Sequence, residues 1–302
     1  MVHWKVFGEV LLILLIKIRM KYSIITINYN NRDGLENTIK SVINQTCQDF
    51  EYIVIDGGST DGSVDVIKKY DDRIDYWISE PDKGIYNAMN KGILQAHGEY
   101  LNFMNSGDCF YDEKVLQEVY VRLNNDMVVG RDFHFNQQTK RSHKTIFPLR
   151  LSMFTFYSSY LPHQSTFFKK NLFENAMYDE SYKIVSDWKF YIQKIIDEAC
   201  NVSFIDVVVA WREQDGISSG EMDLVNIERE KVLKEFLPSG INSDYQTLTK
   251  IDRGTLEKLL ILCDMPRANR LLTYFIKTIY RLIKIKQWCT FMKKRLPHIF
   301  FC

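Results

Sequence analysis

Four clusters of polar residues and glycines each follow a short apolar run in this sequence. They are Asn28-Tyr29-Asn30, Asp56-Gly57-Gly58-Ser59-Thr60-Asp61-Gly62, Asp82-Lys83-Gly84 and Asn105-Ser106-Gly107-Asp108. Any one of them could be only a turn, since Asp, Asn, Ser and Gly are the usual turn residues. Four such turns in succession are harder to explain by folding alone. The carboxylates and amides in these clusters are therefore candidates for binding a metal or a phosphate.

Two common phosphate-binding loops are absent from the sequence. Gly57 and Gly62 have the spacing of a Walker A loop, but Ser63-Val64 follows where that loop has Lys-Ser or Lys-Thr. No G-x-G-x-x-G follows the first apolar run, so the dinucleotide fingerprint is missing too. A divalent cation at Asp108, Mg²⁺ or Mn²⁺, is the most economical way to hold phosphates, because such ions combine one or two carboxylates with phosphate oxygens.

The apolar runs before the clusters predict the strands of a mainly parallel sheet. Strands are predicted at Tyr22–Asn28, Glu51–Asp56, Ile74–Ser79 and Glu99–Met104, with helices starting in a capping box at Asp33 and covering Ser59–Tyr70 and Gly84–Ala96. Strands separated by helices of this length predict an α/β fold with right-handed crossovers. In such sheets ligands bind outside the carboxyl ends of the strands, which is where the four clusters lie.

Beyond Asp108 the pattern is less regular. We expect a helix at Glu113–Leu123, short strands at Met127–Gly130 and Val202–Ala210, and a helix within Tyr182–Glu198. The remainder of the chain is predicted to be helical. These patterns divide the chain into residues 20–220, with halves 22–108 and 109–220, and a helical tail at 221–302.

The composition limits the classes of function. The 302 residues are 46% hydrophobic and 25% charged, which is ordinary for a globular protein. The net charge of +1 hides an asymmetry, because Met265–Cys302 holds nine Lys or Arg and no acid, which leaves about −8 on the other residues. An acidic body argues against nucleic acid as a partner. The six scattered cysteines form no C-x-x-C pair and fit a reduced, cytoplasmic setting.

The first nineteen residues contain a short apolar run, Val10–Ile16. It is too short to span a bilayer, which needs roughly 20 residues, and no small-residue cleavage site follows it. We interpret residues 1–19 as a non-native extension, with translation starting at Met20. A weak membrane anchor is the alternative.

Residues 22–108 resemble the nucleotide-sugar-binding half of family 2 glycosyltransferases. The matching stretches include SIITINYNNRDGLENTIKSVINQ, EYIVIDGGSTDGS and SEPDKGIYNAMNKG. The last of these is similar to transferases that assemble exopolysaccharide of the colanic acid type. The resemblance is weaker over Leu161–Phe190 and absent after about Gly220. It implies a GT-A fold, a nucleotide-sugar donor, a divalent metal and inverting transfer to a hydroxyl acceptor.

Carried over by position, the resemblance implies roles for particular residues. Donor contacts are implied for Asn28, Tyr29, Asp56 and Asp108, the last of which also holds the metal. Lys83, Gly84 and Ser106 are further donor-binding candidates from the same loops, and a solvated surface lysine is the alternative for Lys83. Asp187, in Ser186-Asp187-Trp188, matches the base that takes the acceptor's proton. A helix cap is the alternative role for Asp187. His163, Gln164 and Trp188 are expected on the acceptor side, with the donor diphosphate as the alternative neighbour of His163 and Gln164. Gly216-Ile217-Ser218 is expected to close over the donor.

Three departures from the family pattern bear on specificity. Many relatives carry D-D-G-S, whose second carboxylate reaches the nucleobase, but Gly57 stands at that position here. The D-x-D-type signature keeps one carboxylate, Asp108. The Q-x-x-R-W motif of processive synthases is absent, which favours addition of a single sugar.

The basic tail is predicted to bind an anionic membrane surface. In a helix from Pro266, the cations Arg270, Lys277, Arg281 and Lys284 share one side. The other side is apolar and consists of Leu271, Leu272, Phe275, Ile276, Ile279, Leu282 and Ile283. This arrangement suits a helix lying in the interface, and we expect it to end near Lys286, before the Lys293-Lys294-Arg295 cluster. Packing of the apolar side on the catalytic domain is the alternative.

The sequence thus favours a transferase on the inner face of the cytoplasmic membrane, with a lipid-linked or oligosaccharide acceptor. Two other functions stay open. A metal-dependent nucleotidyltransferase would share the sheet and the metal, and a non-catalytic membrane-surface module would keep only the fold. The presence of both Asp108 and Asp187 argues against the second.

Overall fold

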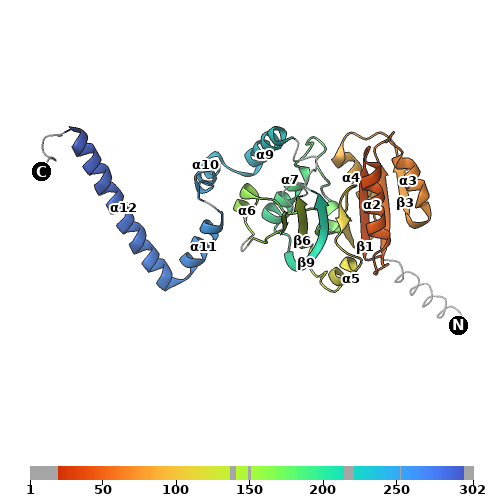
Figure 1. Ribbon diagram of the computed structural model, residues 1–302, viewed down its shortest axis with the longest axis horizontal. Helices are drawn as coiled ribbons and strands as arrows, with labels where there is room; N and C mark the ends of the chain where they lie inside the picture. Colours follow the sequence, from red (N-terminus) through yellow and green to blue (C-terminus); the bar gives the residue numbers. More distant parts are fainter. Residues whose placement is uncertain (1–19, 137–140, 149–150, 214–220, 252, 296–302) are drawn as a thin grey trace. The chain divides into compact units, whose positions relative to one another are not determined.

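The computed structural model describes residues 20–136, 141–148, 151–213, 221–251 and 253–295 (Figure 1). The predictions for residues 1–19 and for Gly216-Ile217-Ser218 concern parts of the chain outside these ranges. The chain forms two compact units, one ending at Pro238 and one beginning at Ser239. The first unit contains all four polar clusters.

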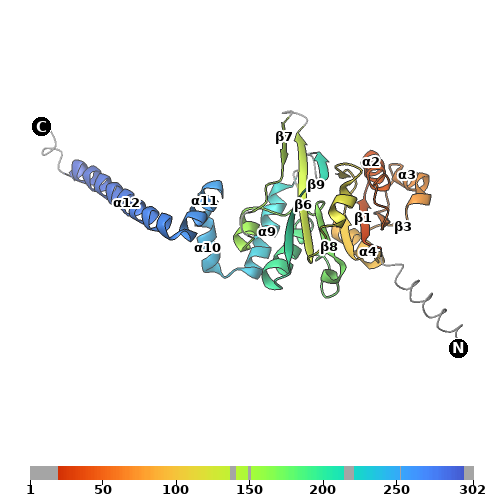
Figure 2. The ribbon, with the colours of Figure 1, turned by 90° about the horizontal axis from the view of Figure 1, so that it is seen from below.

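A mixed sheet of nine strands, counted over the described residues, forms the first unit (Figures 1 and 2). Its order is β3-β2-β1-β4-β8-β6-β9-β5, with β7 paired to β6. The strands are β1 (Tyr22–Asn28), β2 (Phe50–Asp56), β3 (Tyr76–Ser79), β4 (Tyr100–Phe103), β5 (Cys109–Phe110), β6 (Met127–Asn136), β7 (Arg141–Lys144), β8 (Thr166–Lys169) and β9 (Val202–Glu213). The first four run parallel, and β8 is antiparallel to both β4 and β6. This is the α/β, GT-A-type arrangement that we expected.

Helices cover both faces of the parallel strands. The helices of the first unit are α2 (Arg32–Ile43), α3 (Ser63–Lys69), α4 (Ile85–Gln95), α5 (Val115–Tyr120), α6 (Met153–Ser158), α7 (Ser186–Ile192), which continues as a π-helical turn to Asp197, and α9 (Met222–Phe236), and of these α2, α3 and α4 pack on β1 and β2. Ile24 packs in one core cluster with Leu35 and Ile39 of α2. Ile25 instead packs against Gly92 of α4, where an added Cβ would lie 2.5 Å from Ile25 Cγ2. Alternate residues of β1 are therefore buried on opposite faces, which explains its continuous apolar sequence.

Several predicted boundaries differ from the structure. The capping box at Asp33 is wrong, because the N-cap of α2 is Asn31, whose side chain accepts a hydrogen bond from the Gly34 amide. The second helix starts at Ser63 rather than Ser59, since the preceding residues form a loop. Strand β6 continues past Gly130 to Asn136 because it pairs with β7 and β9 (Figure 2). The sequence did not predict this extension, because the β7 partner, Arg-Ser-His-Lys, contains no apolar residue.

Helix α9 belongs to the first unit and not to the tail, so the boundary that we expected at residue 220 lies at Pro238. Val232 of α9 is fully buried. Glu235 pairs with Lys189 of α7 at 2.7 Å. The sequence did not predict that α9 packs on the first unit, because several of its contacts there are made by charged side chains such as Glu235.

The second unit contains α10 (Ser239–Leu248), α11 (Arg253–Asp264) and α12 (Pro266–Arg295). Helix α12 does not end near Lys286 as expected, because no Gly or Pro interrupts it after Pro266. Its four predicted surface cations are exposed, and so are the apolar Leu271, Phe275 and Ile276. Within the described ranges, none of the helices combines the length and the hydropathy needed to cross a bilayer.

Candidate active site

The carboxyl ends of β1, β2 and β3 bring three of the polar clusters to one edge of the sheet. Asn28 pairs with Asp56 across β1 and β2, and Asp56 pairs with Ser79 across β2 and β3. The fourth cluster joins them after β4, where the Ser106 amide donates to the Ile27 carbonyl at 3.0 Å. The predicted convergence of the four clusters is therefore present.

Asp56 lies fully buried at the centre of this edge. Its Oδ1 accepts hydrogen bonds from Asn28 Nδ2 at 2.7 Å and Ser59 Oγ at 2.6 Å, and its Oδ2 accepts from Ser79 Oγ at 2.6 Å. Burial alone would raise the pKa of Asp56, but the hydrogen bonds from Ser59, Ser79 and Asn28 hold it below its ordinary value. Asp56 thus positions three strand ends, in addition to the donor contact that the resemblance implies.

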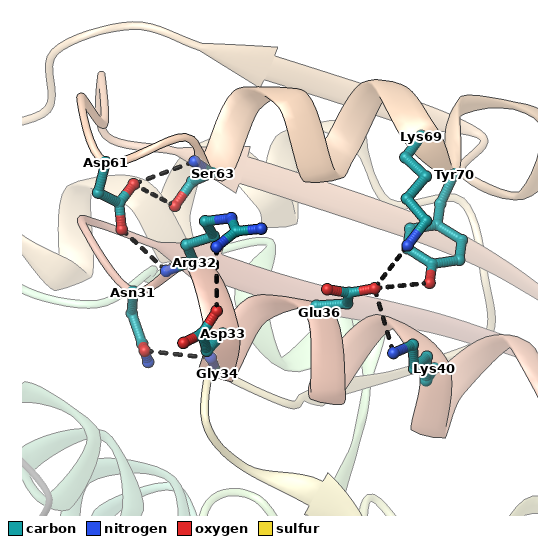
Figure 3. A network of polar contacts seen from close by, with 10 residues as sticks. All are labelled: Asn31, Arg32, Asp33, Gly34, Glu36, Lys40, Asp61, Ser63, Lys69 and Tyr70. Atoms are coloured by element: carbon teal, nitrogen blue, oxygen red, sulfur yellow. Dashed lines mark hydrogen bonds and ion pairs between the residues drawn. The ribbon is translucent and has the colours of Figure 1, made fainter.

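Asp61 ties the starts of α2 and α3 together (Figure 3). Its Oδ2 accepts from the Arg32 amide at 2.8 Å, and its Oδ1 accepts from the amide and the hydroxyl of Ser63. Farther along the same helices, Glu36 binds Lys40, Lys69 and Tyr70 (Figure 3). These contacts fix α2 and α3 relative to each other, and with them the loops that follow β1 and β2.

Three of the predicted donor-binding residues are open to a ligand. Tyr29 is 66% exposed although its ring is large and aromatic. Lys83 is exposed, and its ammonium makes no hydrogen bond or ion pair among the described residues. Gly84 precedes α4 with φ of 120°, and a Cβ there would meet no atom within 4 Å. Asn28, by contrast, is buried, and its amide nitrogen donates a hydrogen bond to Asp56.

The loop after β4 carries Asp108 and Ser106. Thr38 of α2 fixes the loop, since its hydroxyl donates to the Asp108 carbonyl at 2.7 Å and accepts from the Gly107 amide at 3.0 Å. Gly107 has φ of 99°, a conformation that favours glycine. The Ser106 carbonyl accepts from Asn31 Nδ2 at 3.1 Å. The Asp108 carboxylate accepts a hydrogen bond from Gln164 Nε2 at 3.0 Å.

The residues around Asp108 suit a cation that also binds the substrate. No group of three His, Cys, Asp or Glu gathers around a common point in the described part of the chain. The available ligands are oxygens. Besides the Asp108 carboxylate, Asn105 Oδ1 and Gln164 Oε1 are buried without a hydrogen bond. Mg²⁺ and Mn²⁺ prefer such ligands and complete their shell with phosphate oxygens and water.

Asp187 is held by two side chains from other elements. Its Oδ1 accepts from the Tyr86 hydroxyl at 2.8 Å, and its Oδ2 lies 3.2 Å from His163 Nδ1. Val185 occupies the N-cap position of α7, so the alternative that Asp187 caps this helix is wrong. Burial would raise the pKa of Asp187, but the hydrogen bond and charge of His163, together with the Tyr86 hydrogen bond, hold it below its ordinary value. The carboxylate is therefore ionised at neutral pH.

Two consecutive residues connect the two candidate carboxylates. His163 contacts Asp187, and Gln164 contacts Asp108. The other ring nitrogen of His163 lies 3.2 Å from Asn105 Nδ2, in the loop that carries Asp108. The structure thus brings Asp108, His163, Gln164 and Asp187 into one site.

Trp188, for which an acceptor-side contact is predicted, is held in the protein interior. It is buried, and its indole N–H donates to the Phe156 carbonyl at 3.1 Å. Arg229 of α9 stacks on the Trp188 ring at 4.7 Å. Gln164 is also buried, and its side-chain amide donates to the Asp108 carboxylate.

Sequence reasoning missed two residues of this site, Tyr86 and Glu228. Tyr86 stands inside SEPDKGIYNAMNKG, a run that we connected only with the donor, so a signal was present. Glu228 of α9 accepts hydrogen bonds from the amides of Lys183, Ile184 and Val185, at 2.7, 3.0 and 3.2 Å. It fixes the segment that leads into Asp187. No local pattern marks this role, since it depends on where α9 docks.

Comparison with known proteins supports this description. Residues 23–184 match the family profile of Glycosyl transferase family 2. An uncharacterized glycosyltransferase of Mycobacterium tuberculosis is 33% identical over 202 residues, which are 65% of this chain and 76% of that protein. A PGL/p-HBAD biosynthesis glycosyltransferase of the same organism is 29% identical, over 69% of this chain and 83% of its own. The putative teichuronic acid biosynthesis glycosyltransferase TuaG of Bacillus subtilis is 36% identical over 32% of this chain and 40% of its own.

Solved structures share the fold. TarS of S. aureus, residues 1–349 in complex with UDP-GlcNAc, aligns with a TM-score of 0.53 and 18% identity, over 65% of this chain and 59% of that one. The mannosyltransferase PcManGT of Pyrobaculum calidifontis, in complex with GDP-Man and Mn²⁺, aligns with a TM-score of 0.52 and 16% identity, over 68% of this chain and 61% of that one. This chain aligns with 42% of the longer TarS chain. With the profile match, the chain belongs to glycosyltransferase family 2 and is a glycosyltransferase with a GT-A-type fold.

Proposed function

We propose that this glycosyltransferase moves one sugar, with inversion, from a nucleotide-sugar donor to a hydroxyl acceptor in bacterial cell-surface polysaccharide synthesis. The observation that carries the proposal is the link through His163 and Gln164 between Asp187 and Asp108. One carboxylate for the acceptor's proton and one for the donor's diphosphate are what such a transfer needs. The SEPDKGIYNAMNKG run supports an acceptor of the exopolysaccharide, colanic acid-like type.

Asp187 acts as the base in this proposal. Its ionised carboxylate takes the proton of the acceptor hydroxyl while that oxygen bonds to the anomeric carbon of the sugar. The bond from the anomeric carbon to the diphosphate oxygen breaks at the same time, and the nucleoside diphosphate leaves. His163 and Tyr86 orient the carboxylate and keep it ionised between turnovers.

Asp108 is the residue that would hold a divalent cation, with substrate oxygens completing its shell. When bound, Mg²⁺ or Mn²⁺ supplies positive charge to the diphosphate. Lys83, exposed beside the start of α4, is placed to add a second positive charge. The complex of PcManGT with GDP-Man and Mn²⁺ supports this assignment by fold likeness.

A lipid-linked acceptor is proposed from the second unit. The exposed cations Arg270, Lys277, Arg281 and Lys284 accompany exposed apolar residues on the same helix, α12. A helix of this composition binds an anionic leaflet in the plane of the interface. Such binding would hold the enzyme on the inner face of the cytoplasmic membrane, where lipid-linked sugars are accessible.

A panel of nucleotide-sugars tests the proposed function. We expect one donor to raise the melting temperature in the presence of Mn²⁺ and to be hydrolysed slowly without an acceptor. The expected products are a free sugar and a nucleoside diphosphate. Release of pyrophosphate from a nucleoside triphosphate would instead indicate a nucleotidyltransferase. No response to any donor would contradict the proposal.

A further inference from the structure

The carboxylate of Asp82 fills the space that a side chain at position 57 would occupy. A Cβ added to Gly57 would lie 2.4 Å from Asp82 Oδ2 and 3.2 Å from Tyr29 Cδ2. The φ of Gly57 is not among the positive values of this chain, so its backbone does not require glycine. The absence of a side chain at Gly57 is explained by the neighbouring carboxylate.

The next glycine brings the segment that carries Asp82 against the end of β2. Gly58 has φ of 79°, and a Cβ there would lie 3.2 Å from the Pro81 nitrogen. The Glu80 amide donates to the Asp56 carbonyl at 3.0 Å. Because the segment from Glu80 to Asp82 packs this closely, the side chain of Asp82 extends over Gly57.

One oxygen of Asp82 remains available to a ligand. Its Oδ1 accepts from the Gly84 amide at 2.9 Å, whereas Oδ2 accepts no hydrogen bond from the described residues. Asp82 is half-buried. The adjacent Tyr29 ring is 66% exposed, so an acceptor oxygen and an open aromatic face both border Gly57.

We propose that Asp82 reads the nucleobase of the donor, with the Tyr29 ring as one wall of the base site. The proposal rests on the proposed function, since it assumes a nucleotide-sugar donor. An ionised carboxylate only accepts hydrogen bonds, so it selects a base whose ring nitrogen carries a hydrogen. Uracil and guanine present such an N–H, whereas adenine and cytosine present a lone pair at that edge. Thymine presents the same N–H as uracil, so Asp82 selects a uridine, thymidine or guanosine diphosphate sugar.

This assignment also explains the departure at Gly57. Relatives with D-D-G-S place a carboxylate on the residue at position 57. In this chain a carboxylate enters the same space from the loop after β3. A carboxylate therefore lies beside position 57 in this chain too, but Asp82 in the loop after β3 supplies it.

Binding of nucleoside diphosphates by calorimetry in the presence of Mn²⁺ tests the assignment. The probes are UDP, GDP, ADP and CDP, with UDP and GDP also methylated at the ring nitrogen. In the wild type, UDP or GDP should bind best, and methylation should weaken its binding about 10- to 100-fold, the range for a hydrogen bond to a charged group. In Asp82→Ala the methylated and unmethylated forms should bind about equally, because the acceptor is gone.

Four further variants test the assignment. Asp65→Ala removes an exposed carboxylate from α3, with the same change of charge, and should keep the full methylation effect. Gly57→Asp combined with Asp82→Ala should restore the effect, whereas Gly57→Asp alone should bind more weakly because two carboxylates collide. If Asp82→Ala lowers the melting temperature, Asp82→Asn keeps the shape of the side chain and should still reduce the effect.

A full methylation effect in Asp82→Ala, or a wild type that prefers ADP or CDP, would overturn the assignment while leaving the proposed function intact. A wild type that binds no nucleoside diphosphate and hydrolyses no nucleotide-sugar would contradict the proposed function itself.

Discussion

The hydroxyl of Tyr86 lies 2.8 Å from Oδ1 of Asp187, which joins two parts of the chain separated by 101 residues. Tyr86 belongs to α4, directly after the loop that carries Asp82 and Lys83. Two more residues of the same helix, Asn87 and Asn90, donate to Glu180 ahead of α7. Helix α4 therefore positions the proposed base as well as the donor loop.

Replacing Tyr86 by Phe should shift the acid limb of the pH–kcat profile to higher pH. The Tyr86 hydrogen bond helps to hold the pKa of Asp187 below its ordinary value, so its loss raises that pKa. The base is then protonated at a higher pH, so the acid limb moves. Separately, loss of the hydrogen bond that orients the carboxylate, worth about 1 kcal/mol net, should lower kcat about 3- to 10-fold on the plateau as well.

Tyr178→Phe is the matched control for this change. Tyr178 is buried beside Tyr86, with ring centroids 5.5 Å apart, and its hydroxyl makes no hydrogen bond within the described ranges. Its pH profile should match that of the wild type. An unmoved acid limb in Tyr86→Phe would show that this hydrogen bond does not tune the base.

The same pKa shift fixes the sign of a stability effect. Because the folded-state pKa of Asp187 is depressed, its contribution to stability is present above its pKa in the unfolded chain. That contribution is lost as the pH falls through the folded-state value. Asp187→Asn should therefore make stability less dependent on pH in the acid range, which urea unfolding at a series of pH values would measure.

Glu228→Gln should destabilise the first unit and lower kcat. The carboxylate of Glu228 accepts three backbone N–H groups, and an amide has one oxygen to replace it. At least one buried donor then loses its partner, which costs about 1–3 kcal/mol. Urea unfolding measures the loss, and Glu230→Gln is the control because Glu230 pairs only with Lys234 on the surface. Equal stabilities of the two variants would contradict the role given to Glu228.

Activity should require a divalent cation. Excess EDTA should abolish transfer, and Mn²⁺ or Mg²⁺ should restore it. Asp108→Asn should weaken binding of the nucleoside diphosphate in Mn²⁺ but change it little in EDTA, because the variant loses the protein carboxylate that holds the ion. Full turnover in EDTA would exclude a metal at Asp108.

Neutralising the basic side of α12 should release the protein from anionic vesicles. Changing Arg270, Lys277, Arg281 and Lys284 to Gln removes four cations, each contributing about 1 kcal/mol near an anionic surface. Sedimentation with liposomes should then fall to the level seen with neutral lipid or high salt. Exchanging Arg and Lys at the same positions keeps the charge and should keep the binding. If the wild type does not sediment with anionic liposomes, the proposal that α12 binds a membrane surface is wrong.

The parallel half of the fold could be predicted from the sequence because each strand is apolar on both faces and ends in a polar cluster. Strand β1 was placed at Tyr22–Asn28, as the structure has it. The hairpin of β6 and β7 was missed because β7 has no apolar residue, and the alternation in its partner is limited to Phe133 and Phe135. Asp108 and Asp187 could be proposed from motifs, whereas the approach of Asp82 to Gly57 and the docking of Glu228 depend on tertiary packing.

The measurement that tests the central claim most directly is single-turnover transfer by Asp187→Asn with the donor found in the nucleotide-sugar panel. Asparagine keeps the size and can still accept the Tyr86 hydrogen bond, but it cannot take a proton. The rate should fall about 100- to 10,000-fold, the usual range for loss of a general base. The donor dissociation constant should stay close to that of the wild type, and the variant should remain folded at the assay temperature although it loses the stability that the ionised carboxylate contributes. A variant that keeps most of its transfer rate would show that the base is not Asp187.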